Sequence, residues 1–196
     1  MIAPAPSEFG KAELRRDALA RRDAIPAAVR AQAAERVASR PFPIAVRDGA
    51  CVSGFFPMGS EINPVPLMRR LAGGGAKLAL PVVVGRGHPL VFRAWSFGAP
   101  LGSGVWGIRE PLPDAPELLP DVLIVPLAAF DRTGHRIGYG AGYYDLTLKR
   151  LRAAKPVTAI GLGFAAQEIA RVPATPRDAK LDLVLTEREV IDCRGT

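Results

Sequence analysis

The chain has 196 residues, with 26 Lys and Arg side chains against 19 Asp and Glu, which gives a formal net charge of +7 at pH 7. Hydrophobic residues make up 48% of the chain, a proportion that excludes an intrinsically disordered protein. No apolar run reaches the roughly 18–20 residues of a membrane span, and the first residues lack the pattern of a signal peptide. We therefore expect a globular, cytoplasmic protein without a membrane partner.

The positive charge is concentrated in two parts of the sequence. Residues 1–48 and 132–155 carry the basic excess, whereas residues 49–131 balance at zero. Proteins that bind nucleic acids without sequence specificity more often carry a run of about five to eight Lys or Arg residues, and this chain has no such run. The two cysteines and two histidines are too far apart to form a zinc-binding pattern. The composition therefore predicts a localised anion site, without a nucleic-acid partner.

Two helices are predicted at the start of the chain. Residues 7–24 have a candidate capping residue, Ser7, and apolar residues spaced for one buried face. Pro26 then begins a second helix over residues 27–40, because proline is tolerated in a first helical turn. The basic residues of the first helix are interleaved with acidic ones, a pattern typical of a solvated face. These basic residues are Lys11, Arg15, Arg16, Arg21 and Arg22.

Short apolar runs separated by turns follow these helices. Several are continuous stretches of Val, Ile and Leu, which are typical of strands covered on both faces. Helical segments at 65–72 and 143–153 alternate with them, so we expect an α/β fold: one layered domain over residues 1–196, with a mostly parallel sheet flanked by helices and with residues 1–6 flexible. Residues 100–120, with five prolines, are expected to form a long surface loop. The predicted strands are 50–56, 77–84, 90–95, 122–125, 157–162 and 181–185.

The densest pattern lies in residues 121–150. An apolar strand leads into a turn, then into Gly138, Gly140 and Gly142, and then into a helix that begins near Tyr143. Glycine permits positive φ and close approach of the backbone, and a helix N-terminus presents free N–H groups to a phosphate. The spacing matches neither the dinucleotide-fold motif nor the P-loop. A glycine-rich turn with a capping aspartate therefore remains the alternative interpretation.

Charged residues near this segment suit a phosphate and a metal ion. Arg132 and Arg136 precede the glycines and can pair bidentately with phosphate oxygens. Asp145, in the first helical turn, is suited to hold a hard cation such as Mg²⁺. Asp178 lies in a turn before the last predicted strand, where the crevice of an open sheet would bring it near Asp145. Asp182 is the competing candidate for the second ligand.

Two further positions have alternative interpretations. Glu61 lies in a turn before a helix, where its carboxylate either favours the helix N-terminus or accepts hydrogen bonds from a nitrogen-rich heterocycle. In the second case Phe55, Phe56 and Met58 would form an apolar wall. Trp106 is an isolated large aromatic residue among Gly and Pro. It is either a buried packing residue or a stacking platform for a planar ligand.

These segments, in this order, resemble the 5-formyltetrahydrofolate cyclo-ligase family, also called 5,10-methenyltetrahydrofolate synthetase. The most specific block is FDRTGHRIGYGAGYYD at residues 130–145, which matches the family signature F-D-x-x-G-x-R-x-G-Y-G-x-G-Y-Y-D. The weaker blocks are K-x-x-x-R at 11–15, F-x-P-M-x-x-E ending at Glu61, W-G-I-x-E-P at Trp106, and Q-x(10)-D-x-x-x-D at 167–182. The resemblance spans nearly the whole chain.

The resemblance implies a single α/β domain and a defined reaction. Enzymes of the family use ATP and Mg²⁺ to convert 5-formyltetrahydrofolate to 5,10-methenyltetrahydrofolate, with release of ADP and phosphate. In the family mechanism the formyl oxygen attacks the γ-phosphoryl group, and the folate N10 then closes the ring and expels phosphate. Such phosphoryl transfer needs positioning and charge neutralisation but no protein nucleophile. The implied partners are these two small molecules, with no obligatory protein partner.

The resemblance also implies roles at the nucleotide. Lys11 and Arg15 would contact the phosphates, the loop 136–144 would wrap the nucleotide, and Asp145 and Asp178 would hold Mg²⁺. The implied ATP-binding residues are Lys11, Arg15, Arg136, Gly138, Tyr139, Gly140, Ala141, Gly142, Tyr143 and Tyr144.

A second group of residues is implied to bind the folate. These residues are Phe56, Glu61, Trp106, Tyr143 and Tyr144. Glu61 would face the pterin, and the two tyrosines would lie where the ligands meet. Together with Arg136, the tyrosines are the implied catalytic residues.

Two departures from the family pattern leave questions open. Some family members have a basic residue at the position of Ala141, so a phosphate contact from that site would come from elsewhere, with Arg132 as the candidate. The first helix carries three arginines besides Arg15, which leaves the register of the phosphate-binding arginine open. The alternative functions are a paralogue with the same ATP site and another substrate, and a non-catalytic folate-binding protein.

Overall fold

The computed structural model describes residues 8–195, and its four α-helices within that range agree with the four predicted helices to within one residue at each described end. The expected cap Ser7 and residues 1–6, expected to be flexible, lie outside the described residues. Pro26 is the N-cap of the second helix, in agreement with the prediction that it begins there. The helices are α1 (Glu8–Asp23), α2 (Ala27–Ser39), α3 (Val65–Gly73) and α4 (Tyr143–Ala154).

A seven-stranded sheet in the order β11-β10-β9-β6-β1-β2-β3 forms the centre of the molecule. Its five inner strands pair in parallel, and β3 and β11 pair antiparallel at the two edges, which confirms the predicted mostly parallel sheet. Strand β11, which follows the last predicted strand, was not expected. The strands are β1 (Cys51–Ser53), β2 (Lys77–Val82), β3 (Val91–Trp95), β6 (Val122–Pro126), β9 (Thr158–Leu162), β10 (Leu183–Leu185) and β11 (Val190–Asp192).

The expectation of a long loop over residues 100–120 is wrong in part. This segment forms an antiparallel ribbon of β4 (Leu101–Ser103) and β5 (Arg109–Pro111), joined through the 3-10 helix η1 (Val105–Gly107). Pro111 is compatible with the ribbon because a two-stranded pair has only edges, where a missing N–H need not interrupt a ladder. Pro100 and Pro111 therefore lie at the two ends of a small sheet, and the other three prolines follow it.

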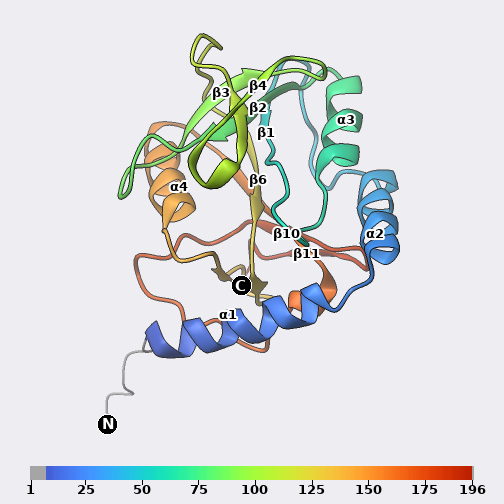
Figure 1. The fold of residues 1–196 in the computed structure, drawn as a ribbon, viewed down its shortest axis with the longest axis vertical. Coiled ribbons are helices and arrows are strands. Elements are labelled where there is room, and N and C mark those ends of the chain that lie inside the picture. Colours follow the sequence, from blue (N-terminus) through green and yellow to red (C-terminus); the bar gives the residue numbers. More distant parts are fainter. Residues whose placement is uncertain (1–7, 196) are drawn as a thin grey trace.

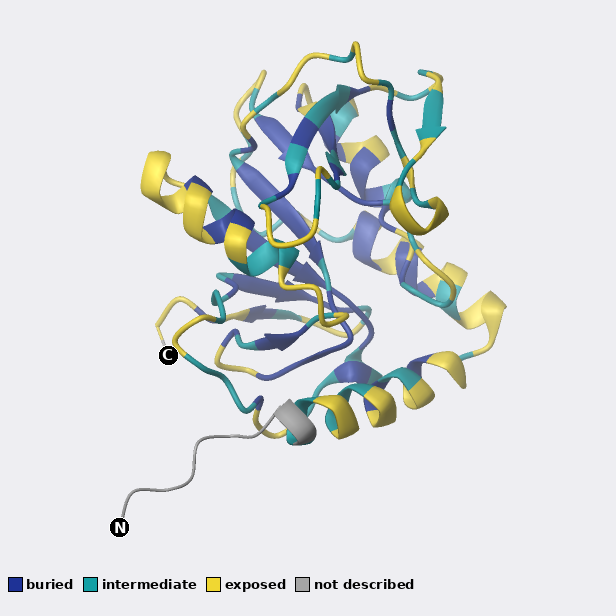
Figure 2. Ribbon diagram, turned by 60° about the vertical axis from the view of Figure 1, so that its left-hand side comes forward, coloured by how far each residue is buried: buried dark blue, intermediate teal, exposed yellow. Residues whose placement is uncertain are grey.

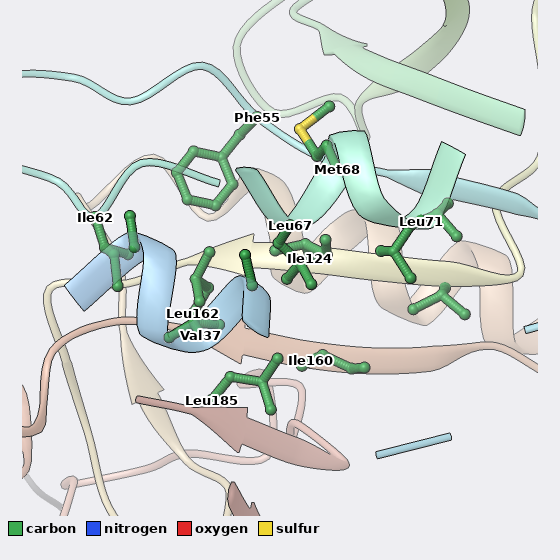
Figure 3. Packing of buried hydrophobic residues seen from close by; sticks show 14 of the residues in the cluster. Val37, Phe55, Ile62, Leu67, Met68, Leu71, Ile124, Ile160, Leu162 and Leu185 are labelled. Atoms are coloured by element: carbon green, nitrogen blue, oxygen red, sulfur yellow. The ribbon is translucent and has the colours of Figure 1, made fainter. Parts of the chain in front are cut away.

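Helices cover both faces of the central sheet, as Figure 1 shows. On one face Ile124 of β6 packs with Val37 of α2 and Leu67 of α3, in the cluster drawn in Figure 3. On the other face Leu123 packs in a cluster with Leu148 of α4. Each such aliphatic side chain, once fully buried, contributes about 1.5–3 kcal/mol to the free energy of unfolding. The continuous apolar runs of the inner strands reflect this burial on both sides.

Helix α1 lies across one end of the sheet. It contacts β7 (Ala129–Phe130) and the 3-10 helix η2 (Ala165–Gln167), which follow the carboxyl ends of β6 and β9. Figure 2 shows exposed residues along its outer side, whereas Ala18 is completely buried. Ligands of open α/β sheets bind at the carboxyl ends of the strands, so α1 borders the expected site. Over residues 8–195 the structure contains no helix that is long and apolar enough to span a membrane.

Candidate active site

The inward face of α1 is basic. Lys11, Arg15, Ala18 and Arg22 are separated by four, three and four residues, a spacing that puts them on one face of a helix. The side chain of Lys11 is 17% exposed and that of Arg22 is 8% exposed. Arg16, on another face, is 73% exposed. The interpretation as a solvated face is therefore correct for Arg16 and wrong for Lys11 and Arg22.

Two of these cations contact residues of the predicted site: Lys11 contacts a predicted metal ligand, and Arg15 contacts a predicted nucleotide-binding residue. Lys11 Nζ donates to Asp178 Oδ2 at 2.6 Å. Arg15 Nε donates to the carbonyl oxygen of Gly138 at 2.6 Å. Gly138 is the first residue of the segment 138–142, which we call the glycine loop. Arg21, in contrast, donates to the carbonyl of Ala166 in η2. Arg15 therefore contacts the backbone of the glycine loop, whereas Arg21 contacts η2 and Arg16 is exposed.

The glycine loop, residues 138–142, joins β8 (Arg136–Ile137) to the start of α4 at Tyr143, as the pattern predicted. Gly140 and Gly142 have φ of +98° and +68°, values that favour glycine. Gly142 is the N-cap of α4, and no side chain among residues 8–195 caps the first turn. The N–H groups of that turn are consequently available to an anion. The alternative of a capping aspartate is wrong, because Asp145 bonds elsewhere.

Arg136 and Asp145 connect the glycine loop to the segment around Asp178. The Arg136 side chain is 4% exposed, and its Nη2 donates to Asp145 Oδ1 at 3.0 Å. Its Nη1 donates to the carbonyl oxygen of Ala179 at 2.8 Å, and the Ala179 N–H donates to Asp145 Oδ1 at 3.0 Å. Since Ala179 follows Asp178 directly, these bonds bring the two predicted metal ligands into neighbouring positions.

Asp178 is held as a carboxylate. Its Oδ2 accepts the Thr175 N–H at 2.6 Å and the Thr175 hydroxyl at 2.9 Å, besides Lys11. Burial alone would raise the pKa of Asp178, but the hydrogen bonds from Lys11 and Thr175 outweigh it and lower the pKa below its ordinary value. All these donors use Oδ2, so Oδ1 accepts no hydrogen bond from residues 8–195.

The competing candidate, Asp182, lies at the other end of α4. Its Oδ2 accepts from Arg152 in the last turn of α4 at 2.8 Å and from the Ala159 N–H at 2.7 Å. Asp145, in contrast, belongs to the first turn of the same helix. The geometry therefore groups Asp178, rather than Asp182, with Asp145.

Glu61 is held in the loop between β1 and α3. Its Oε2 accepts the Met58 N–H at 2.8 Å. Burial raises the pKa of Glu61, and hydrogen bonds from Tyr139 and Met58 oppose that rise. The N–H of Val65 at the start of α3 is bonded by Asn63, and the first turn of α3 contains no acidic residue. The interpretation of Glu61 as a residue that favours the helix N-terminus is therefore wrong.

Aromatic residues near Glu61 have different environments. Phe56 is half-buried and packs edge-on against Trp95, with ring centroids 5.5 Å apart. Phe55 is 4% exposed and belongs to the core, as Figure 3 shows, so it does not form a wall as expected. Met58 is 36% exposed.

Trp106 is accessible to solvent. The residue is 67% exposed, which excludes the interpretation as a buried packing residue. It has φ of +58°, and within residues 8–195 it is the only non-glycine residue with positive φ. Such a conformation costs about 1–3 kcal/mol and is found most often at functional sites. Its ring centroid lies 6.1 Å from that of Tyr143. The next residue, Tyr144, is half-buried, and burial raises the pKa of its phenol.

The sequence interpretation assigned Arg132 incorrectly and missed Arg22. Arg132 pairs with Glu168 at 2.8 Å and with Glu189 at 2.6 Å, so it is not directed to the glycine loop. Arg22 Nη1 instead donates to the hydroxyl of Tyr139 in the loop at 2.7 Å. The signal that could have found Arg22 is its helical spacing from Lys11 and Arg15.

Comparisons with known proteins identify one family for this chain. Residues 8–187 match the family model described as the 5-formyltetrahydrofolate cyclo-ligase family. The 5-formyltetrahydrofolate cyclo-ligase of Mycolicibacterium smegmatis is 34% identical over 196 residues, which cover 94% of this chain and 97% of the relative. The protein of the same name from Escherichia coli is 32% identical over 168 residues, covering 81% of this chain and 88% of the relative.

A solved structure has the same fold. The NMR structure of 5,10-methenyltetrahydrofolate synthetase from Aquifex aeolicus superposes with a TM-score of 0.76 at 28% identity, and the match covers 95% of this chain and 94% of that chain. The family match extends over nearly all of the described residues and includes the glycine loop, the two aspartates and the basic face of α1. The chain therefore belongs to the 5-formyltetrahydrofolate cyclo-ligase family and is an enzyme, a ligase.

Proposed function

We propose that the protein uses ATP and Mg²⁺ to convert 5-formyltetrahydrofolate to 5,10-methenyltetrahydrofolate, with release of ADP and phosphate. Family membership supports the conversion of the folate. The use of ATP is supported chiefly by one observation: the basic face of α1 and the uncapped start of α4 both border the glycine loop. A triphosphate matches this combination of guanidinium, ammonium and backbone N–H donors.

Three cations would neutralise the phosphates. Lys11 and Arg15 come from α1, and the buried Arg136 comes from β8. Each charge-assisted hydrogen bond to a phosphate oxygen contributes about 1.5–3 kcal/mol to binding. The first turn of α4 adds the positive end of a helix dipole. Part of the net charge of +7 is thereby explained without a polyanionic partner.

Asp145 and Asp178 suit a magnesium ion. The bonds from residues 8–195 to these carboxylates end on Oδ1 of Asp145 and Oδ2 of Asp178, which leaves one oxygen of each for a hard cation. No cluster of three or more acidic, His or Cys side chains that could hold a metal ion occurs among those residues. Phosphate and water oxygens would complete the coordination, as is usual for Mg²⁺. When bound, Mg²⁺ neutralises charge on the transferring phosphoryl group.

The folate would lie between Glu61 and Trp106. The Glu61 carboxylate would accept N–H groups of the pterin, and the exposed indole of Trp106 would stack on a planar part of the ligand, with Phe56 as an apolar neighbour. Tyr143, next to Trp106, and Tyr144 would adjoin both ligands. A tyrosine phenol is protonated at neutral pH, and burial raises the pKa of Tyr144 further, so this phenol would be a hydrogen-bond donor.

The reaction requires positioning more than acid or base groups. The formyl oxygen forms a bond to the γ-phosphorus as the bond to the ADP oxygen breaks. N10 then bonds to the formyl carbon, loses its proton and displaces phosphate. Arg136 would stabilise the charge on the transferring phosphoryl group, since its position is fixed by Asp145 and Ala179. The chain supplies no covalent intermediate in this proposal.

One assay tests the proposal. Purified protein is mixed with 5-formyltetrahydrofolate, ATP and Mg²⁺, and the absorbance of the methenyl product is followed, with parallel reactions that lack ATP or contain EDTA. We expect product only in the complete mixture. Folate binding without product would favour the non-catalytic folate-binding protein, and ATP hydrolysis without a response to folate would favour a paralogue with another substrate.

A further inference from the structure

Arg22 connects three segments of the site. Its side chain, on α1, is 8% exposed. Nε donates to the hydroxyl of Ser60 at 2.8 Å, next to Glu61 in the loop before α3. Nη1 donates to the hydroxyl of Tyr139 in the glycine loop at 2.7 Å. One nearly buried guanidinium thus bonds to the loop that carries the proposed folate carboxylate and to the loop that carries the proposed nucleotide site.

The direction of these bonds fixes the hydroxyl of Tyr139. A guanidinium only donates, so the Tyr139 oxygen is the acceptor in its bond with Arg22. The single hydroxyl proton of Tyr139 is then available to the Glu61 carboxylate, with which this hydroxyl interacts. The Met58 N–H holds the same carboxylate from its own loop. The Met58 N–H therefore orients Glu61 from its own loop, and the Tyr139 hydroxyl of the glycine loop interacts electrostatically with the same carboxylate.

The charges in this chain of contacts support each other. Burial of the Glu61 carboxylate is unfavourable, and both Tyr139 and the positive charge of Arg22 counteract it. Within the part of the chain that the structure describes, Arg22 itself approaches one carboxylate directly, that of Asp23 at 3.4 Å, and the Asp23 side chain is 60% exposed. Loss of the Tyr139 hydroxyl would leave Arg22 and Glu61 without their common partner. The Tyr139 hydroxyl thus interacts with Arg22 and with the proposed folate-binding residue Glu61, although the Tyr139 backbone is part of the glycine loop.

We propose that Arg22 and Tyr139 are positioning residues that couple the two ligand sites, so that nucleotide bound at the glycine loop strengthens folate binding at Glu61. The inference rests on the proposed function, because it requires both ligands. A nucleotide that orders residues 138–142 also fixes the Tyr139 hydroxyl, and through Arg22 and Ser60 it fixes the loop that carries Glu61. Coupling of this kind changes affinity by about 5- to 150-fold and is reciprocal between the ligands.

The test measures the Kd of 5-formyltetrahydrofolate with and without the β,γ-imido analogue of ATP and Mg²⁺. For the parent protein we expect folate to bind about tenfold more tightly when the analogue is present. Tyr139→Phe removes one hydroxyl and retains the ring, and Arg22→Gln removes the charge. In each single variant the ratio of the folate Kd without the analogue to that with it should fall close to one. The double variant should have the same ratio as the single variants. Arg16→Gln, which removes an exposed arginine of the same helix, should leave the ratio unchanged.

The outcomes separate coupling from folding and from the proposed function. A merely structural role for Arg22 would lower Tm or the active fraction without changing the ratio. If Arg22→Gln does not fold, Tyr139→Phe decides, because Tyr139 is 40% exposed and its ring is retained. A ratio near one in the parent, or a parental ratio in Tyr139→Phe, would overturn the inference while leaving the enzyme reaction intact. A parent that binds neither ligand would overturn the proposed function itself.

Discussion

Lys11 Nζ lies 2.6 Å from Asp178 Oδ2, so a cation proposed to bind phosphate is paired with a carboxylate proposed to bind magnesium. The two residues are 167 positions apart in sequence, and each side chain is 17% exposed. In the proposed complex the magnesium cation would pair with Asp178, and the triphosphate anion would pair with Lys11. The ion pair therefore holds α1 and the Asp178 turn in the arrangement that the bound pair of ligands would require.

Lys11→Gln should weaken ATP binding and leave folate binding nearly unchanged. Loss of one charge-assisted hydrogen bond is expected to raise the KM for ATP about 10- to 100-fold. Steady-state rates at saturating folate measure this effect, and Arg16→Gln is the matched control because that residue is 73% exposed on the same helix. An unchanged KM for ATP in Lys11→Gln would remove Lys11 from the nucleotide site.

Asp145→Asn should abolish magnesium-dependent turnover with little loss of folate affinity. The asparagine carbonyl can still accept the bonds from Arg136 and Ala179, so the fold around it should be preserved while the negative charge is lost. Titration of the rate with Mg²⁺ checks this expectation. Asp182→Asn, in the competing candidate, should retain the magnesium dependence of the parent. Equal losses of folate affinity and turnover in Asp145→Asn would instead assign Asp145 to the support of the fold.

Local signals in the sequence were sufficient for most of the fold. The three glycines before Tyr143 predict the start of α4. The continuous apolar runs predict the inner strands, because these strands are buried on both faces of the sheet. The ribbon at residues 100–120 was missed because proline and glycine mark turns, whereas the pairing of Leu101 with Pro111 depends on contacts between segments. Strand β11 was missed for the same reason, since its three residues gain their order from β10.

The sequence predicted the candidate site only where its residues lie in one continuous segment, as they do in the glycine loop. The choice between Asp178 and Asp182 required knowledge of which end of α4 each one faces. Arg22 was grouped with solvated residues because acidic neighbours alternate with it along the chain, although its spacing from Lys11 and Arg15 puts it on their face. Burial of an arginine depends on the loops packed against the helix, which the helix sequence does not specify.

Glu61→Gln should weaken folate binding more than ATP binding, and it should flatten the pH dependence of folate affinity. Burial raises the pKa of Glu61, so the charged form is lost at a higher pH than for an exposed glutamate as the solution is acidified. Folate Kd values measured from about pH 8 to pH 5 should therefore rise in the parent and stay nearly constant in the variant. A folate Kd equal to that of the parent would remove Glu61 from the site.

Trp106→Ala should reduce folate affinity without a measurable change in stability. Trp106 is 67% exposed, so removal of its side chain leaves no cavity in the core. Loss of one aromatic stacking contact, about 1 kcal/mol, corresponds to a roughly fivefold higher folate Kd. Trp106→Phe keeps a ring and should recover part of that affinity. If both variants bind folate like the parent, the indole does not contact the ligand.

Asp131 should stabilise the hairpin formed by β7 and β8, which carries Arg136. Its carboxylate, in a residue that is 1% exposed, accepts the Thr133 N–H at 2.9 Å, the Thr133 hydroxyl at 2.7 Å and the Val172 N–H at 2.8 Å. Burial alone would raise the pKa of Asp131, but these bonds outweigh it and lower the pKa below its ordinary value. A carboxylate with a lowered pKa stabilises the fold above its unfolded-state pKa, and that contribution is lost as pH falls through the folded-state pKa.

Asp131→Asn is therefore expected to reduce the free energy of unfolding at pH 7 by about 1.5–3 kcal/mol, since hydrogen bonds to a charged group are lost. The deficit should narrow toward acid, because the parent carboxylate is then protonated as well. Urea denaturation at neutral and acidic pH measures both values. Asp192→Asn is the control, because Asp192 is 53% exposed and pairs with the nearby Arg194. A deficit that stays constant with pH would mean that the shape of the Asp131 side chain, rather than its charge, stabilises the hairpin.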